Sequence, residues 1–574
     1  SGETEGDRNV AIGAYTLFNQ NNTTNANAYN TAVGYNAGFA TTTAIQNTLI
    51  GGLAGDALTT GSNNIAIGVL ALSAEDTGSK NIAIGFQSLA AQNFNGDAFN
   101  VAIGYQAGST VTTGVENILI GGNAGDALTS GNYNIAIGRN ALSAEDAHGR
   151  NVAIGHSALA AQDAGADAYN VAVGFWAGLS LTTGVYNVLL GATAGDAITT
   201  AEKNIAIGYG ALGSEDTHGR NIAIGDSALT TLNAGAYGYN TAVGFEAGKA
   251  MTTGVKNTLI GGSTGDALTS GHSNTAVGGA LGSEDTTGKS VAIGYIALNA
   301  QNAGSDSYNV AVGHSAGASV NTGVQNTLIG GRAGDALTTG QANAALGYNA
   351  LGASVDGNHN TAIGCTALED YEGGNGEGHN TAIGSLSQSN ATTGEFNTSL
   401  GTLAMGVGVT TGDHNVGIGY QNLQALTSGT KNAIVGNLAG KSLTTGSDNA
   451  VLGYGALNSE DAHGKNVAIG ADALHTLDPA SAVNTYNVAI GYNAGLSATT
   501  GINSVLVGGL AGDALTTGTN NVALGYSALS AEDTGSSNVA IGSHALEDLN
   551  YNGSGYNTAV GHAAGRNVTT GTLN

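Results

Sequence analysis

A five-residue unit, Asn-x-Ala-[Ile/Val/Leu]-Gly, recurs along the whole chain and constrains its fold more than any other feature. It appears first as NVAIG at Asn9 and last as NTAVG at Asn557, with 32 copies in 574 residues. Gly ends all 32 copies, Ile, Val or Leu always precedes it, and Asn opens 30 of them, with Ser290 and Ser504 as the exceptions. Such self-similarity is typical of solenoids, in which each repeat contacts only its neighbours.

The spacing of the units divides the coils into groups of four. From Asn81 the spacings are 19, 17, 17 and 17 residues, and the series repeats every 70 residues. The four coil types are represented by the segments that open at Asn30 (NTAVGYNAG), Asn47 (NTLIGGLAGDALTTG), Asn64 (NIAIGVLALSAEDTGSK) and Asn81 (NIAIGFQSLAAQNFNGDAFN). Residues 366–380 hold an inserted loop, and residues 380–448 form irregular coils that break the series. We therefore predict a single continuous solenoid over residues 1–574.

The alternation within the unit predicts a short strand that is apolar on both faces. Positions two and four, mostly β-branched, fall on one face of an extended segment, and position three, usually Ala, falls on the other. A strand of this kind is buried on both sides, but one coil encloses only its own inner side. The sequence thus predicts an all-β parallel β-solenoid, or β-roll, of about 32 coils, whose second strand face is covered by a partner chain.

We interpret the Asn that opens each unit as part of an internal ladder, in which each side-chain amide bonds to its equivalents in the adjacent coils. The first eight members are Asn9, Asn30, Asn47, Asn64, Asn81, Asn100, Asn117 and Asn134. The alternative is a flat surface array of Asn or Thr that binds glycans or ice. We favour the ladder because each Asn adjoins the apolar strand. The invariant Gly suits a corner with positive φ or a close approach of two backbones.

Composition and charge exclude several classes of partner. The net charge of −27 disfavours nucleic acid and anionic membrane surfaces, both of which require clustered cations. The single Cys365 cannot form a disulfide within one chain. The sequence has neither an apolar run of membrane-spanning length nor a signal-peptide pattern at its start, so we expect no membrane contact by this segment. A start at Ser1 suggests processing, or a piece of a longer chain.

The units resemble the head repeats of trimeric autotransporter adhesins, in which a similar strand and a short return strand form a left-handed parallel β-roll. They are equally similar to the repeat regions of phage tail-fibre proteins, where NTAIG-type coils alternate with TTG turns, much as NTAIGSLSQSNATTG does from Asn380. The resemblance implies a homotrimeric rod on a cell or virion surface. The four-coil series is a departure from the adhesin heads. The chain stops at Asn574 where another coil would open, which fits truncation or end-to-end stacking into a filament.

Aromatic residues cluster in coils of the first type and form a tentative recognition surface. Its members are Tyr29, Tyr35, Phe99, Tyr105, Tyr169, Phe175 and Trp176. Stripes of aromatic side chains stack on sugars, and they also pack over loops or between chains. A host-surface or glycan receptor is the partner that the first interpretation implies.

Acidic pairs recur in coils of the third type, at Glu75-Asp76, Glu145-Asp146, Glu215-Asp216, Glu284-Asp285, Glu460-Asp461 and Glu532-Asp533. We considered Ca²⁺ for these pairs, but copies four coils apart are separated by about 19 Å, so we expect solvated turns. The segment GGLAGDAL from Gly51 matches a Ca²⁺-binding nonapeptide except at Ala54, but it occurs once per 70 residues. We therefore expect no cofactor, with calcium as the one alternative.

The sequence shows no catalytic constellation. The 12 His are scattered, with no His-x-x-x-His and no nearby Cys, which indicates neither a zinc site nor a catalytic triad. The insertion from Glu369 to His379 has carboxylates but no basic cluster. We expect a non-enzymatic, extracellular structural fibre or adhesin, with a phage tail-fibre shaft of receptor-binding role as the alternative. An ice-binding or polysaccharide-lyase solenoid is disfavoured because the Thr-Thr pairs skip the Glu-Asp coils.

Overall fold

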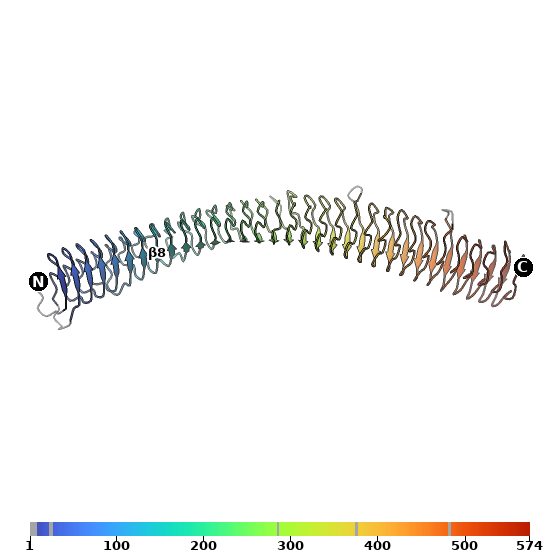
Figure 1. The fold of residues 1–574 in the computed structure, drawn as a ribbon, viewed down its shortest axis with the longest axis horizontal. Coiled ribbons are helices and arrows are strands. Elements are labelled where there is room, and N and C mark those ends of the chain that lie inside the picture. Colours follow the sequence, from blue (N-terminus) through green and yellow to red (C-terminus); the bar gives the residue numbers. More distant parts are fainter. Residues whose placement is uncertain (1–7, 22–26, 284–285, 287, 374–376, 480–483) are drawn as a thin grey trace. The chain divides into compact units, whose positions relative to one another are not determined.

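The chain folds as a parallel β-solenoid in the computed structural model, which describes residues 8–21, 27–283, 286, 288–373, 377–479 and 484–574. These residues contain 32 strands and no helix, and hence no helix of a length and apolar character that would cross a membrane. They divide into two compact units, Ser1–Thr286 and Thr287–Asn574. Within each unit the strands lie side by side in one row, and the rest of each coil returns on one side of that row (Figure 1).

Every strand has three residues, which are positions two to four of the repeated unit. The first unit contains β1 (Val10–Ile12), β2 (Thr31–Val33), β3 (Thr48–Ile50), β4 (Ile65–Ile67), β5 (Ile82–Ile84), β6 (Val101–Ile103), β7 (Ile118–Ile120), β8 (Ile135–Ile137), β9 (Val152–Ile154), β10 (Val171–Val173), β11 (Val188–Leu190), β12 (Ile205–Ile207), β13 (Ile222–Ile224), β14 (Thr241–Val243), β15 (Thr258–Ile260) and β16 (Thr275–Val277). The second unit contains β17 (Val291–Ile293), β18 (Val310–Val312), β19 (Thr327–Ile329), β20 (Ala344–Leu346), β21 (Thr361–Ile363), β22 (Thr381–Ile383), β23 (Thr398–Leu400), β24 (Val416–Ile418), β25 (Ala433–Val435), β26 (Ala450–Leu452), β27 (Val467–Ile469), β28 (Val488–Ile490), β29 (Val505–Val507), β30 (Val522–Leu524), β31 (Val539–Ile541) and β32 (Thr558–Val560).

Consecutive strands within each unit pair in parallel and in register. In β4 and β5, for example, Ile65 lies beside Ile82 and Ala66 beside Ala83. The middle residue of each strand points into the solenoid, as does the fully buried Ala66, while Ile65 and Ile67 on the opposite face are only partly covered. The predicted alternation is therefore confirmed, and position three is the one that faces the core.

A leucine interlock in the core gives a physical reason for the four-coil series. Leu119, the middle residue of β7, is fully buried, and a Cβ added to Gly108 would lie 2.6 Å from its Cδ1. A Cβ added to Gly125 would lie 2.8 Å from the Cδ2 of the same leucine. Leu89, in the coil before Gly108, approaches that glycine from the other side, at 3.1 Å. Leu119 thus fills the space that Gly125 of its own coil and Gly108 of the preceding coil leave free.

The irregular coils fill the core by substitution. Tyr371, in the inserted loop, is fully buried, and its hydroxyl donates a hydrogen bond to the carbonyl oxygen of Glu377 at 2.6 Å. Gly417 replaces the usual Ala in β24, and a Cβ at that position would lie 2.8 Å from the Cε of the buried Met405. A flexible Met thus occupies the space that the missing side chain leaves.

The invariant Gly meets both requirements that the sequence suggested. Gly68 has a φ of +137°, and a Cβ added there would lie 2.4 Å from the carbonyl oxygen of Gly85 in the next coil. Positive φ is not limited to glycine, however, because Leu70 and Leu72 adopt values of 61° and 53°. No sequence pattern predicted these left-handed leucines.

Candidate functional site

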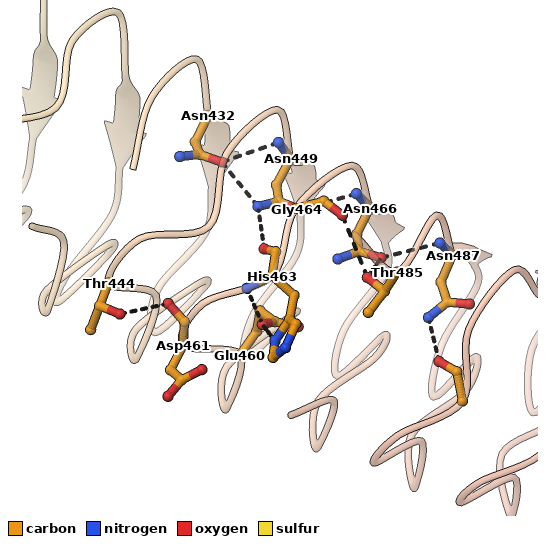
Figure 2. Close-up of polar contacts among 11 residues, drawn as sticks. Asn432, Thr444, Asn449, Glu460, Asp461, His463, Gly464, Asn466, Thr485 and Asn487 are labelled. Carbon is orange, nitrogen blue, oxygen red and sulfur yellow. Dashed lines mark hydrogen bonds and ion pairs between the residues drawn. The ribbon is translucent and has the colours of Figure 1, made fainter. Parts of the chain in front are cut away.

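The asparagines that open the units line one internal corner of the solenoid. Asn432, Asn449 and Asn466 are buried, and Figure 2 shows their side chains following one another from coil to coil. Asn449 Oδ1 accepts the backbone N–H of Asn466 at 3.0 Å, and Asn449 Nδ2 donates to Asn432 Oδ1 at 3.0 Å. Asn449 Nδ2 also donates to the carbonyl oxygen of His463, across its own coil, at 3.2 Å.

The ladder contains the amide-to-amide bonds that we expected, as from Asn47 Nδ2 to Asn30 Oδ1 at 3.3 Å, but they are not its most regular contact. Its most regular bond is the one from each backbone N–H to the Oδ1 of the preceding Asn, as between Asn64 N and Asn47 Oδ1 at 2.8 Å. The second bond runs across the coil, as from Asn64 Nδ2 to the carbonyl oxygen of Gly78 at 2.9 Å. Each Asn thereby satisfies backbone groups that a buried corner would otherwise leave unpaired. Since the side chains are buried, they form no surface array for glycans or ice in the described coils.

The outer strand face is apolar and accessible in each unit. Positions two and four of the strands point outward, and Ile118 remains 37 % exposed. An open hollow on this face of the second unit is lined by β19, β20 and β21, with only apolar residues and one Thr at its surface. Contiguous apolar surface that extends over many coils is far larger than the patches of ordinary soluble monomers.

Two rows of side chains border this strand face. The Asn-flanking row consists of the residue before each unit's Asn, and the Gly-flanking row consists of the residue after each unit's Gly. The tentative recognition residues divide between them: Tyr29, Phe99 and Tyr169 lie in the first row, Tyr35, Tyr105 and Phe175 lie in the second, and Trp176 follows Phe175. All seven are exposed. The structure therefore places them along both borders of one face.

Aromatic rings in these rows stack on their neighbours from adjacent coils. In the Gly-flanking row, Phe86 stacks on Tyr105 with ring centroids 5.4 Å apart. In the Asn-flanking row, Tyr169 stacks on Tyr186 with ring centroids 5.4 Å apart, and within one coil Phe175 stacks on Trp176 at 4.6 Å. The rings lie over one another along the solenoid. The outer edges of the rings and the free face of the last ring in each stack therefore remain exposed to solvent.

The Asn-flanking row also holds most of the cations of this acidic chain. Nine of the 14 Lys and Arg occupy it: Arg8, Lys80, Arg150, Lys203, Arg220, Lys256, Lys289, Lys431 and Lys465. The guanidinium of Arg150 lies 5.6 Å from the ring of Tyr133 and 5.4 Å from that of Tyr169, in the coils before and after it. The attraction between a cation and the face of an aromatic ring holds Arg150 between its two neighbours in the row.

The glutamates of the acidic pairs contradict our expectation of solvated turns. Glu75, Glu145, Glu215, Glu460 and Glu532 are fully buried, and the pair Glu284-Asp285 lies outside the described residues. Each stands six residues before the Asn of the next unit, where other coils place a core residue such as Leu58 or Leu128. This equivalence can be found in the sequence by superimposing the coils on the repeated Asn. Without that superposition, a Glu-Asp pair beside Gly is typical of a surface turn.

Burial raises the pKa of all five glutamates, because the charged carboxylate loses its hydration. For Glu215 the pKa rises to about 7. Backbone N–H groups partly offset this effect: Gly78 N donates to Glu75 Oε1 at 2.6 Å, and Gly535 N donates to Glu532 Oε1 at 2.6 Å. In the coil drawn in Figure 2, His463 lies against Glu460 and donates its backbone N–H to Glu460 Oε1 at 2.7 Å.

The calcium-like segment places Asp56 on a coil that faces no second copy of the motif. Burial raises the pKa of Asp56, and its Oδ1 has no hydrogen-bond partner. Over the described residues, the groups of three or more potential metal ligands occur elsewhere, in the acidic turns that also carry a histidine. The segment from Gly51 therefore supplies one buried oxygen rather than a ligand cage.

The inserted region presents an open hollow of about 790 Å³, whose lining includes Asp356, Asp370 and Glu372. Its described lining residues contain no basic side chain, no His and no Cys. Cys365 is exposed. No protein-family model matches the chain, and no curated protein matches it either.

Proposed function

We propose that this chain is an extracellular structural fibre, a repetitive solenoid that forms the head or shaft of an attachment appendage on a cell surface. The observation that supports it most strongly is the exposed apolar strand face, which is repeated on coil after coil and bordered by aromatic rows. A regular scaffold with a repeated face suits many identical weak contacts rather than one catalytic centre.

The strand face suits packing against further copies of the same chain. Its outward Val, Ile and Thr side chains recur at the coil spacing, about 4.8 Å. A partner can match that spacing over many coils only if it has the same spacing. A second copy meets this condition, and the resemblance to trimeric adhesin heads implies three copies around a common axis. Burial of this face would supply the partner contact that the apolar strands require.

Light scattering on the purified chain tests the assembly. The expected mass is three times the 56.1 kDa of one chain. Replacing the outward residues of three adjacent strands, as Val101→Asp, Ile118→Asp and Ile135→Asp, is expected to weaken association, because each charge would be desolvated in the interface. The control is Thr113→Asp, an exposed residue on another part of the same solenoid. A well-folded wild-type monomer would refute the proposed assembly.

The aromatic rows suit adhesion, because they remain at the borders of the packed face, where exposed rings stack on sugars. A glycan array probed with the wild-type fibre tests this role. Removing Phe175 and Trp176 as a double Ala variant is expected to lower binding without changing the assembled mass. A virion-borne fibre would use the same rows to bind its receptor, and binding to bacterial surface glycans would favour that tail-fibre alternative. Binding to no surface glycan would contradict an adhesive role through sugars.

A further inference from the structure

Three acidic turns carry a histidine beside the buried glutamate. They contain Glu145, Asp146 and His148 in one coil, Glu215, Asp216 and His218 four coils later, and Glu460, Asp461 and His463 in the second unit. In each group the potential ligand atoms lie within 4.8 Å of one another, and the first group includes Asp163 from the following coil. We call these groups the histidine turns.

The first histidine turn has two buried polar atoms without hydrogen-bond partners. Glu145 is fully buried, and its Oε1 accepts the backbone N–H of His148 at 3.1 Å, but its Oε2 has no partner. The Nδ1 of His148 is also buried without a hydrogen-bond partner, 3.6 Å from Glu145 Oε1. Unpaired buried oxygen and nitrogen atoms each cost free energy. A single cation placed between them would satisfy both.

The unpaired oxygen accompanies the histidine throughout the described turns. Glu145, Glu215 and Glu460 all have an Oε2 without a partner. Glu75 and Glu532 have Gly where the others have His, and there Oε2 accepts a backbone N–H from the next coil, at 3.3 and 3.4 Å. At Glu145 and Glu215 the equivalent N–H groups, those of Ala164 and Ala234, partly offset the rise in the carboxyl pKa but form no hydrogen bond with Oε2. The chain itself therefore closes the turns with glycine more completely than the turns with histidine.

We propose that the histidine turns bind a divalent transition-metal ion, with Zn²⁺ as the ion that their donors fit best. One imidazole nitrogen with two or three carboxylate oxygens is a mixed donor set that suits zinc, whereas Ca²⁺ and Mg²⁺ take oxygen ligands. Zn–N and Zn–O bonds are about 2.0–2.2 Å long. The donors would therefore close by about 1 Å around the ion, which the partly exposed Asp146, His148 and Asp163 can accommodate.

The first turn is the most complete of the three. Asp163 comes from the coil after Glu145, so an ion there would cross-link two successive coils. The equivalent residue after Glu215 is Asn233, and after Glu460 it is Asp478. A neutral amide is a weaker ligand for zinc than a carboxylate. We expect the turn at Glu215 to bind more weakly than the turn at Glu145.

Zinc uptake by the full chain, produced without a histidine tag, tests the proposal by equilibrium dialysis and metal analysis. The test variant combines His148→Gly, His218→Gly and His463→Gly, because glycine occupies the same place in the turns at Gly78 and Gly535. The control variant replaces three histidines outside these turns, His156, His314 and His562, by Ala. Wild type and control are expected to take up three ions per chain, and the test variant to bind zinc about tenfold or more weakly.

Hydrogen exchange locates the ion within the same molecule. Zinc is expected to slow amide exchange in the coils around His148, and to leave the coils around Gly78 unchanged, since that turn has no histidine. The proposal is overturned if the wild type takes up no zinc at micromolar concentrations, or if the test variant takes up as much as the control. Equal protection of the coils at Gly78 and at His148 would also overturn it, because the ion would then bind elsewhere.

Discussion

Replacing the invariant glycine of one coil tests the close stacking of backbones at that corner. Gly68 has a φ of +137°, a conformation that side-chain-bearing residues adopt at a cost of about 1–3 kcal/mol. The Cβ of Gly68→Ala would also lie 2.4 Å from the carbonyl oxygen of Gly85 and 2.6 Å from its carbonyl carbon. The two coils would have to separate by about 1 Å, which weakens the hydrogen bond from Gly85 N to Ile67 O, 2.7 Å long, at a further ~1–2 kcal/mol.

The sum of these costs is about 2–5 kcal/mol at one junction between coils. Because a solenoid opens locally, hydrogen exchange measured coil by coil is the suitable assay. Amides of β4 and β5 are expected to exchange roughly thirtyfold to several thousandfold faster in Gly68→Ala, since 1.4 kcal/mol corresponds to a factor of ten. The matched control is Gly52→Ala, because a Cβ at Gly52 would meet no atom within 4 Å. If the two variants exchange alike, the stacking argument is wrong.

Substitutions at three further positions test the interior. Asn64→Ala removes the acceptor for Asn81 N and the donor to Gly78 O. We therefore expect the free energy of local opening, measured coil by coil by hydrogen exchange, to fall by about 2–4 kcal/mol. Asn64→Ser keeps an acceptor oxygen and should lose less. Leu119→Ala should cost about 2–5 kcal/mol because two neighbouring glycines cannot fill the cavity, and a milder effect in urea unfolding would contradict the leucine interlock. Burial raises the pKa of Glu75 above its ordinary value. The neutral carboxyl therefore makes its full contribution to stability below about pH 4.5, and this contribution is lost as the pH rises through the folded-state pKa. Glu75→Gln should therefore become more stable relative to wild type as the pH rises from 4 to 8. Parallel pH profiles of the unfolding free energy of the two proteins would refute the pKa shift.

The fold was largely predictable because its information is repeated. A strand such as Ile65–Ile67 is too short to identify alone, but 32 copies at regular spacing establish its period and its two faces. The buried Asn was predictable for the same reason, since it adjoins every strand. The direction of its hydrogen bonds was not, because they depend on which backbone groups face the corner.

The acidic turns show where sequence reasoning failed. A Glu followed by Asp and a glycine has the composition of a solvated turn, and only superposition of the coils shows that Glu145 aligns with Leu128. The approach of Asp163 to His148 depends on the stacking of two successive coils, which adds a ligand from about 15 residues away. Spacing rules for metal ligands within one short segment cannot detect such a group.

The leucine interlock between Leu119 and its flanking glycines also determines how a chain of this kind can change in length. Deleting the coil of Leu119 would leave Gly108 without the leucine that packs on it, and deleting the coil of Gly108 would bring Leu119 against Leu89. Deleting or duplicating 70 residues preserves the order of all four layers. Recombination between equivalent segments of the gene would therefore lengthen or shorten the solenoid in steps of about 19 Å, each of which leaves the interior intact.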